Sequence, residues 1–187
     1  MRFTETDIAG AYLVELEPFS DERGTFARIW CEDELRARGL TAHLSQCSIS
    51  RNRRAGTLRG MHFQRPPHEE AKLVRCTRGA IYDVALDLRP SSPTERRWVA
   101  AELTAENGSA LFIPEGCAHG FQTLVDDSDV LYLISRPYVP DAAGGVRWDD
   151  PAFGIEWPHA IGRTLSERDR QWPDYEGSAG NRRSRGA

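Results

Sequence analysis

The chain has 187 residues, of which 40% are hydrophobic and 28% charged, and its formal net charge is -4. These values are ordinary for a globular protein with its own core, and the acidic balance argues against general nucleic-acid binding. The first residues lack the apolar stretch of a signal peptide, and no apolar run approaches the roughly 18 residues that span a membrane. We therefore expect a cytoplasmic protein with neither a membrane nor a nucleic-acid partner. Its scattered cysteines are expected to be unpaired: Cys31, Cys47, Cys76 and Cys117.

Short apolar runs separated by turn residues recur along the chain, and most have the length of a β-strand. The expected strands are 11–16, 25–30, 45–50, 56–64, 71–76, 79–88, 98–103, 109–114, 120–125 and 130–135. In the sixth, apolar residues alternate with Asp83 and Asp87, which predicts one apolar and one polar face. Only 31–40, CEDELRARGL, looks helical, with an acidic start, a basic end and Gly39 as the stop. The pattern predicts an all-β sandwich or barrel with a few short helices.

No change in composition and no repeat of fixed period divides the chain. We therefore expect a single domain over residues 1–175. Residues 176–187, EGSAGNRRSRGA, lack apolar anchors and are expected to form a disordered tail.

Four polar side chains stand within or at the end of otherwise apolar strands: His62, Lys72, His119 and Tyr132. Burying such groups is costly unless they are hydrogen-bonded or used. Each also has a purely structural interpretation. His62 could be a satisfied core histidine and Lys72 a surface lysine on an edge strand, while His119 could be a turn residue and Tyr132 a core aromatic. The residues alone leave these alternatives open.

Basic residues near the first of these histidines could hold an anionic ligand. We expect Arg59 to contribute, and a solvated loop for the other three: Arg51, Arg53 and Arg54. A metal site is not expected. Residues 62–64, His-Phe-Gln, lack the second histidine of a His-x-His pair, and Glu69 and Glu70 follow two prolines in an expected turn.

Several longer segments together resemble one family. They are FSDERGTF, GTLRGMHFQRPPHEEAKLVRCTRGAIYDVALDLRPSSPT, IPEGCAHGFQTL, LYLISRPYVP and RWDDPAFGIEWP. In order and almost without gaps, from about residue 10 to residue 175, they resemble the dTDP-4-dehydrorhamnose 3,5-epimerases. The resemblance implies a cupin-type jelly roll that needs no cofactor. It also implies a homodimer with exchanged N-terminal strands, acting on a nucleotide-linked 4-keto-6-deoxyhexose.

The resemblance assigns a role to each residue of a catalytic set. His62 matches the base that removes the protons next to the ketone, and Asp169 matches the carboxylate that holds this base. Tyr132 matches the acid that returns a proton from the opposite face of the sugar. Lys72 matches the group that stabilises the enolate oxygen.

The resemblance also implies a substrate-binding set. Arg23 and Arg59 match ligands of the diphosphate, whose paired oxygens suit a guanidinium. Ser48 stands where asparagine is usual, and the nucleotide base would stack on Tyr138 and on Phe19 or Phe26. The full set is Arg23, Arg28, Gln46, Ser48, Arg59, His119 and Tyr138.

Two positions depart from the family pattern. Arg28 stands where a glutamate usually lies near the nucleotide base, and Ala143 stands where an acidic residue is usual. A carboxylate can accept a hydrogen bond from thymine N3–H and arginine cannot. The identity of the base therefore stays open, more than the chemistry does.

The strand that carries His62 poses a geometric problem. Strict alternation puts Arg59 and His62 on opposite faces, yet the resemblance requires both at one ligand. We therefore predict a bulge or twist near Gly60, where glycine permits irregular backbone.

The resemblance implies epimerisation at both C3 and C5, and two rival functions remain. The first is an epimerase that acts only at C3 or only at C5 of a related nucleotide sugar. The second is a non-catalytic cupin that binds a sugar nucleotide, which would not need an acid–base pair. The combination of His62, Asp169 and Tyr132 argues against this second rival.

Overall fold

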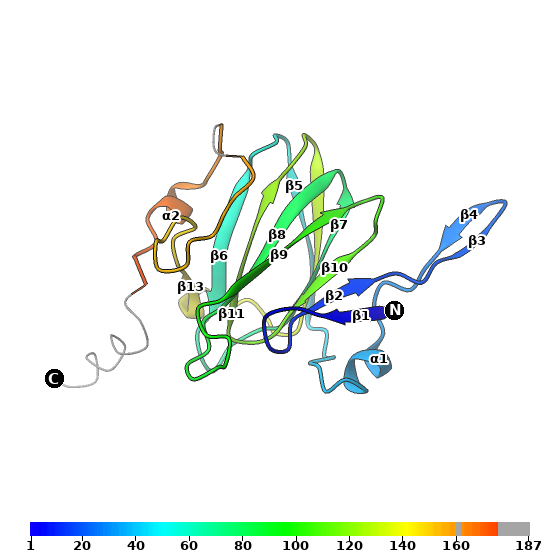
Figure 1. Cartoon of the computed structure of the whole chain (residues 1–187), viewed down its shortest axis with the longest axis horizontal. Helices are drawn as coiled ribbons and strands as arrows, with labels where there is room; N and C mark the ends of the chain where they lie inside the picture. The colour runs from blue at the N-terminus through cyan, green and yellow to red at the C-terminus, as the bar shows by residue number, and fades with distance from the viewer. Residues whose placement is uncertain (160–161, 176–187) are drawn as a thin grey trace.

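The computed structural model describes residues 1–159 and 162–175, so the expected disordered tail lies outside the described residues. Two antiparallel sheets face each other (Figure 1). The first has the order β1 (Arg2–Glu5), β2 (Tyr12–Glu15), β10 (Ala110–Ile113), β7 (Lys72–Arg78), β12 (Ser128–Ile134) and β5 (Gln46–Asn52). The second has the order β13 (Ala143–Gly145), β6 (Leu58–Gln64), β11 (Cys117–Thr123), β8 (Ala80–Asp87) and β9 (Trp98–Thr104).

The remaining elements lie outside these sheets. Strands β3 (Phe19–Asp21) and β4 (Gly24–Phe26) form a separate hairpin that projects from the body (Figure 1). The helices are short: α1 (Glu32–Arg36), α2 (Glu167–Arg170) and the 3₁₀ turn η1 (Pro140–Ala142). The expected all-β cupin-type jelly roll with a few short helices is confirmed. No helix in the described residues is long and apolar enough to span a bilayer.

The main core fills the space between the two sheets. Val74 and Val130 from the first sheet meet Ile81, Ala85 and Phe121 from the second, and all five are fully buried. Each of these side chains lies on the inward face of its strand, because alternate residues of a strand point to opposite faces. Their apolar burial drives the packing of the two sheets.

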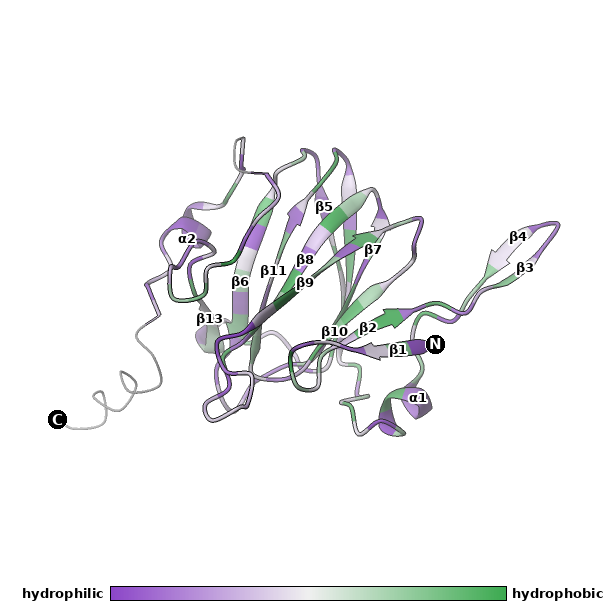
Figure 2. Ribbon diagram, viewed as in Figure 1, coloured by the Kyte–Doolittle hydropathy of each residue, from purple (hydrophilic) through white to green (hydrophobic). Residues whose placement is uncertain are grey.

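The outer face of each sheet is also partly covered. Helix α1 places Leu35 against Leu73 and Phe112 of the first sheet. Phe153 and Trp157 cover the second. Figure 2 shows the resulting pattern, in which β2 is largely green and α1 and α2 carry much purple. Because both faces of these strands are partly covered, their sequences contain more apolar residues than those of a sheet with one solvated face.

The structure differs from the expected elements at several places. The strand expected over 25–30 ends at Phe26, because the β3–β4 hairpin stands away from the sheets and offers no further pairing partner. Strands β1, β3 and β13 and helix α2 were not foreseen. Helix α2 has a side-chain cap, since the Ser166 Oγ accepts a hydrogen bond from the Asp169 N–H at 3.1 Å.

Candidate active site

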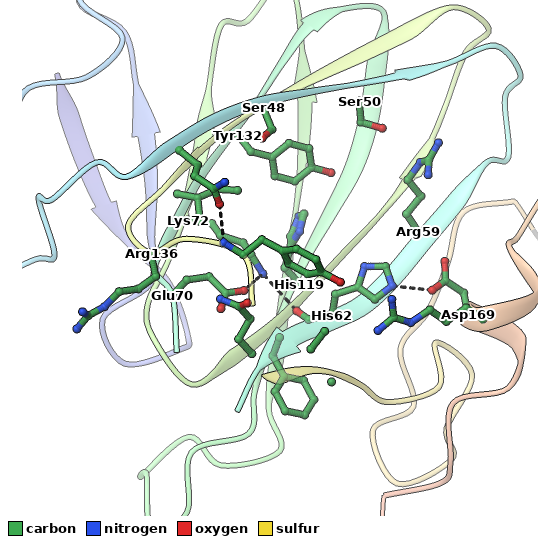
Figure 3. Close-up of a pocket in the computed structure, with 18 of the residues that line it drawn as sticks. Ser48, Ser50, Arg59, His62, Glu70, Lys72, His119, Tyr132, Arg136 and Asp169 are labelled. Carbon is green, nitrogen blue, oxygen red and sulfur yellow. Dashed lines mark hydrogen bonds and ion pairs between the residues drawn. The ribbon is translucent and has the colours of Figure 1, made fainter. Parts of the chain in front are cut away.

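A pocket of about 450 Å³ is lined by residues from both sheets (Figure 3). It brings together nine of the residues predicted from the sequence: Gln46, Ser48, Arg59, His62, Lys72, His119, Tyr132, Tyr138 and Asp169. Six further polar residues of the lining were not predicted: Ser50, Gln64, Glu70, Arg136, Ser166 and Arg168. The six-stranded sheet contributes Tyr132 and Lys72, whereas the five-stranded sheet contributes His62 and His119. A ligand in the pocket therefore has side chains from opposing sheets around it.

His62 and Asp169 form a hydrogen-bonded pair, with His62 Nε2 2.6 Å from Asp169 Oδ1 (Figure 3). The Asp169 side chain is only 5% exposed, whereas that of His62 is 44% exposed. Burial by itself would raise the pKa of Asp169, but the hydrogen bond from His62 and its charge hold that pKa below its ordinary value. Asp169 is therefore ionised near neutral pH. It holds the hydrogen on Nε2, which leaves Nδ1 of His62 as a basic nitrogen.

The backbone of β6 is irregular where the sequence predicted. His62 pairs with His119 and Arg59 pairs with Phe121, so one extra residue of β6 lies between these two pairs. Gly60 has a φ of 147°, and a Cβ at this position would lie 2.6 Å from the Cα of Gly120. The bulge near Gly60 is confirmed, and it lets Arg59 and His62 line the same pocket.

Tyr132 approaches from β12, across the pocket from His62 (Figure 3). Its ring meets the ring of His119 edge-on, with centroids 5.7 Å apart. Burial raises the pKa of Tyr132 well above its ordinary value, and the charge of Asp83 adds to this. The phenol therefore keeps its proton at neutral pH and can donate it. Tyr132 packs against the main core, as the alternative of a core aromatic requires, and it also lines the pocket.

His119 lies in the middle of β11, so the alternative of a turn residue is wrong. Its Nε2 is 2.8 Å from Asp83 Oδ1, and both side chains are buried. Asp83 was placed on the polar face of its strand but was not predicted as a site residue. The only sequence signal for Asp83 was a carboxylate within an apolar strand. Its partner, His119, becomes visible only through the pairing of β8 with β11.

Lys72 lies on an internal strand and is 8% exposed, so the alternative of a surface lysine on an edge strand is wrong. Its Nζ is 2.8 Å from Glu70 Oε1 and donates to the backbone carbonyl of His62 at 3.3 Å. An ammonium that is fixed in this way and largely buried is a strong donor.

Hydrogen bonds also hold the residues at the mouth of the pocket. Gln46 Oε1 accepts from the backbone N–H of Tyr138 at 2.7 Å, and the Tyr138 side chain is largely exposed. Arg59 Nε donates to Asn52 Oδ1 at 2.9 Å, which leaves its terminal nitrogens directed away from that bond. An exposed aromatic ring and a guanidinium that line one pocket suit a ligand with a flat base and a charged group.

Two predicted binding residues lie outside the pocket of their own chain. Arg23 sits at the tip of the β3–β4 hairpin and pairs with Asp21. Arg28 donates to Glu34 at 3.0 Å, and Glu34 also binds the terminal ammonium group at 2.8 Å. The three arginines expected in a solvated loop are exposed: Arg51, Arg53 and Arg54. The expected loop is wrong for Arg51, which lies in β5 and pairs with Asp129 of β12.

The donor groups of the site do not gather around one point. Among residues 1–159 and 162–175, no three His, Cys, Asp or Glu side chains lie close enough to hold a metal ion. The four cysteines are free, and two of them, Cys76 and Cys117, are buried. What the pocket offers is proton transfer: a carboxylate-backed imidazole on one side and a protonated phenol on the other.

Comparison with known proteins points to one group of enzymes. A family model described as dTDP-4-dehydrorhamnose 3,5-epimerase matches residues 5–176. The dTDP-4-dehydrorhamnose 3,5-epimerase of Sinorhizobium fredii is 44% identical over 173 residues, which covers 92% of this chain and 89% of the relative.

Two solved structures resemble the fold over nearly its full length. The dTDP-4-dehydrorhamnose 3,5-epimerase of Bacillus anthracis, with TDP and PPi bound, has a TM-score of 0.89 and 39% identity. That match covers 93% of this chain and 99% of the other. A 3'-monoepimerase from Streptomyces bikiniensis, in complex with dTDP-quinovose, has a TM-score of 0.84 and 34% identity, and covers 90% of this chain and 85% of the other.

Proposed function

Because the chain belongs to the dTDP-4-dehydrorhamnose 3,5-epimerase family, we propose that it epimerises C3 and C5 of dTDP-4-dehydro-6-deoxy-D-glucose, giving dTDP-4-dehydro-L-rhamnose. The observation that carries the proposal is the pairing of His62 with Asp169 on one side of the pocket and Tyr132 on the other. Epimerisation needs two such groups, since a proton leaves one face of the sugar and another arrives at the opposite face.

His62 acts as the base. Asp169 keeps the hydrogen on Nε2, so Nδ1 takes the proton from the carbon next to the ketone, and the carboxylate stabilises the imidazolium that forms. The electron pair of the broken C–H bond moves to the C4 oxygen and gives an enolate. Tyr132 then donates its phenolic proton to the opposite face of the same carbon. The enzyme is restored when the tyrosinate takes a proton from solvent and the imidazolium of His62 releases its proton to solvent.

Electrostatic stabilisation of the enolate supplies what the base cannot. A proton next to a ketone is far less acidic than an imidazolium, so the charge that develops on the C4 oxygen must be held. Lys72 and His119 are the donors proposed for this oxygen, and both are fixed in place by buried carboxylates. Donors that are already oriented need no reorganisation when the charge forms.

The nucleotide is held at the mouth of the pocket. Arg59 binds the diphosphate, and Arg168, which lines the pocket beside Asp169, is a second cation in reach of it. Tyr138 stacks on the base, and Gln46 and Ser48 line the wall beneath. No cofactor takes part in the proposed reaction, which consists of proton transfers alone.

The proposed assembly is a homodimer in which the β3–β4 hairpin of each chain reaches the pocket of its partner. Phe19 and Phe26 lie opposite each other on this hairpin and are 71% and 78% exposed. Two apolar rings as exposed as these support an assembly in which the partner chain covers them. In that dimer Arg23 joins the partner's diphosphate site, and Arg28 comes near the base. Light scattering should give about twice the 21.0 kDa of the chain, and an active monomer would overturn the assembly.

The function is tested by isotope exchange. The protein is incubated in D₂O with dTDP-4-dehydro-6-deoxy-D-glucose, and deuterium at C3 and C5 is followed by NMR. Exchange at both carbons is expected, with none in His62→Ala and residual exchange in Asp169→Asn. Exchange at a single carbon would reassign the protein as a monoepimerase, and exchange at neither would leave only a binding role. We place the reaction in the cytoplasm, which the unpaired cysteines support.

A further inference from the structure

We propose that Glu70 is a positioning residue that aims one N–H of Lys72 at the C4 oxygen of the sugar. The inference rests on the proposed function and concerns a residue that the sequence placed in a turn. Glu70 lies two residues before Lys72, the first residue of β7, and lines the same pocket as Lys72. In Figure 3 the two side chains meet to the left of His62.

The geometry of the ammonium carries the proposal. A lysine ammonium has three N–H donors. One points to Glu70 Oε1 at 2.8 Å, and a second points to the backbone carbonyl of His62 at 3.3 Å. With two directions fixed, the tetrahedral nitrogen leaves a single direction for its third N–H. Because Lys72 lines the pocket, this third donor is available to a bound ligand.

The backbone between the two residues is also clamped. The N–H of Ala71 donates to Ser135 Oγ at 2.8 Å, and the N–H of Ser135 donates to the carbonyl of Ala71 at 3.0 Å. These two hydrogen bonds fix the backbone at Ala71, and the side chains of Glu70 and Lys72 extend from either side of it. Such a pair has little freedom to rearrange when the substrate enters, which is the condition for an oriented donor.

Burial makes the ion pair expensive to keep for stability alone. The side chains of Lys72 and Glu70 are only 10% and 6% exposed. Glu70 Oε2 is buried with no hydrogen-bond partner in the described part of the chain. A buried ion pair with an unsatisfied oxygen is a weak source of stability, and an apolar pair would serve a core better. Its position in the wall of the pocket, where Lys72 also donates to the backbone carbonyl of His62, gives it a use in the proposed reaction.

The test compares two substitutions of similar size. Glu70→Gln keeps an oxygen that can accept from Lys72, whereas Glu70→Leu removes every acceptor. We expect Glu70→Leu to lower kcat about thirtyfold, with KM and the inhibition constant for dTDP within about twofold, since removing one oriented donor costs 10²–10³ and here it is only misaligned. Glu70→Gln should recover most of kcat. The neighbouring Glu69→Leu is the matched control and should leave kcat unchanged.

A double mutant separates positioning from a structural role. In a Lys72→Ala background, Glu70→Leu should cause no further loss, because the group that it orients is gone. Thermal unfolding checks that each variant is folded. If Glu70→Leu does not fold, the comparison of Glu70→Gln with wild type decides the matter. A loss of kcat in Glu70→Gln as large as that in Lys72→Ala would overturn the proposal. Equal kcat in Glu70→Leu and wild type, or additive losses in the double mutant, would also overturn it. A wild type that exchanges no proton in D₂O would instead overturn the proposed function itself.

Discussion

Strand β8 carries two buried aspartates that have opposite surroundings. Asp83 and Asp87 are fully buried and lie on the same face of the strand, because they are four residues apart. The sequence predicted a polar face here, and the structure turns that face to the barrel interior beside Ile81 and Ala85. The two carboxylates differ in how completely they are hydrogen-bonded.

Asp87 is saturated with donors. Its oxygens accept from the Arg89 backbone and guanidinium, from Ser92 Oγ at 2.6 Å and from Thr94 Oγ1 at 2.7 Å. Burial by itself would raise the pKa of Asp87, but the hydrogen bonds from Arg89, Ser92 and Thr94 outweigh it and lower the pKa to about 2. This carboxylate is the centre of a structural network that holds the loop after β8.

Asp83 is only half satisfied. His119 contacts its Oδ1, and its Oδ2 is buried without a hydrogen-bond partner in the described residues. An unmade hydrogen bond of this kind costs about 1–3 kcal/mol. Incomplete satisfaction beside a pocket therefore marks a carboxylate kept for function, whereas complete satisfaction marks one kept for folding. The same criterion singles out Glu70.

The largest expected effect separates the two aspartates by activity. Asp83→Asn should lower kcat about a hundredfold, because His119 loses the charge that orients and polarises it, and should change stability little. Steady-state kinetics and thermal unfolding of the same preparation measure both quantities. A variant with full kcat and a large loss of stability would place Asp83 with Asp87 as a structural residue.

The second expected effect is on stability at the other end of the strand. Asp87→Asn should reduce the free energy of unfolding by about 2 kcal/mol near pH 7, since the pKa is lowered from 3.8 to about 2. Its kcat, measured well below the unfolding temperature, should stay within about twofold of wild type. Urea unfolding gives the first value, and a kcat loss as large as that of Asp83→Asn would erase the contrast.

The pH dependence sharpens the same contrast. The folded-state pKa of Asp87 is depressed, so its contribution is fully present above the unfolded value of 3.8 and is lost as the pH falls through about 2. The stability gap between wild type and Asp87→Asn should therefore narrow from pH 4 downward. Unfolding midpoints at a series of pH values between 5 and 2 test this, and a constant gap would contradict it.

The smallest expected effect tests saturation itself. Thr94→Val removes one of the hydroxyl donors to Asp87 and keeps the shape of the side chain. We expect a loss of about 1 kcal/mol in the free energy of unfolding, since the carboxylate keeps its bonds to Arg89 and Ser92. Denaturant unfolding at pH 7 measures it, with no change in kcat.

Strand patterning was enough to predict the fold class, because alternation and turn residues act locally. The pair of His62 and Asp169 was predicted from the family resemblance alone. These residues lie 107 positions apart in the sequence, and α2 places Asp169 beside His62. Asp83 and Glu70 escaped prediction for a physical reason. Each is defined by a contact across strands or by an oxygen left unsatisfied, and neither property is visible in the order of residues.

The close approach of the paired strands β6 and β11 at Gly60 and Gly120 limits how this pocket can evolve or be redesigned. A Cβ on Gly120 would lie 2.6 Å from Met61 Sδ and 2.9 Å from the Arg59 carbonyl, and one on Gly60 would meet Gly120. Either addition would push the strands apart and displace Arg59 and His62 together. In the proposed mechanism, anchoring of the nucleotide and proton abstraction thus both depend on one close approach of two backbones at glycines that carry no side chain. Libraries that seek a new sugar specificity should therefore vary the facing wall of β5 and β12 and leave these two glycines untouched.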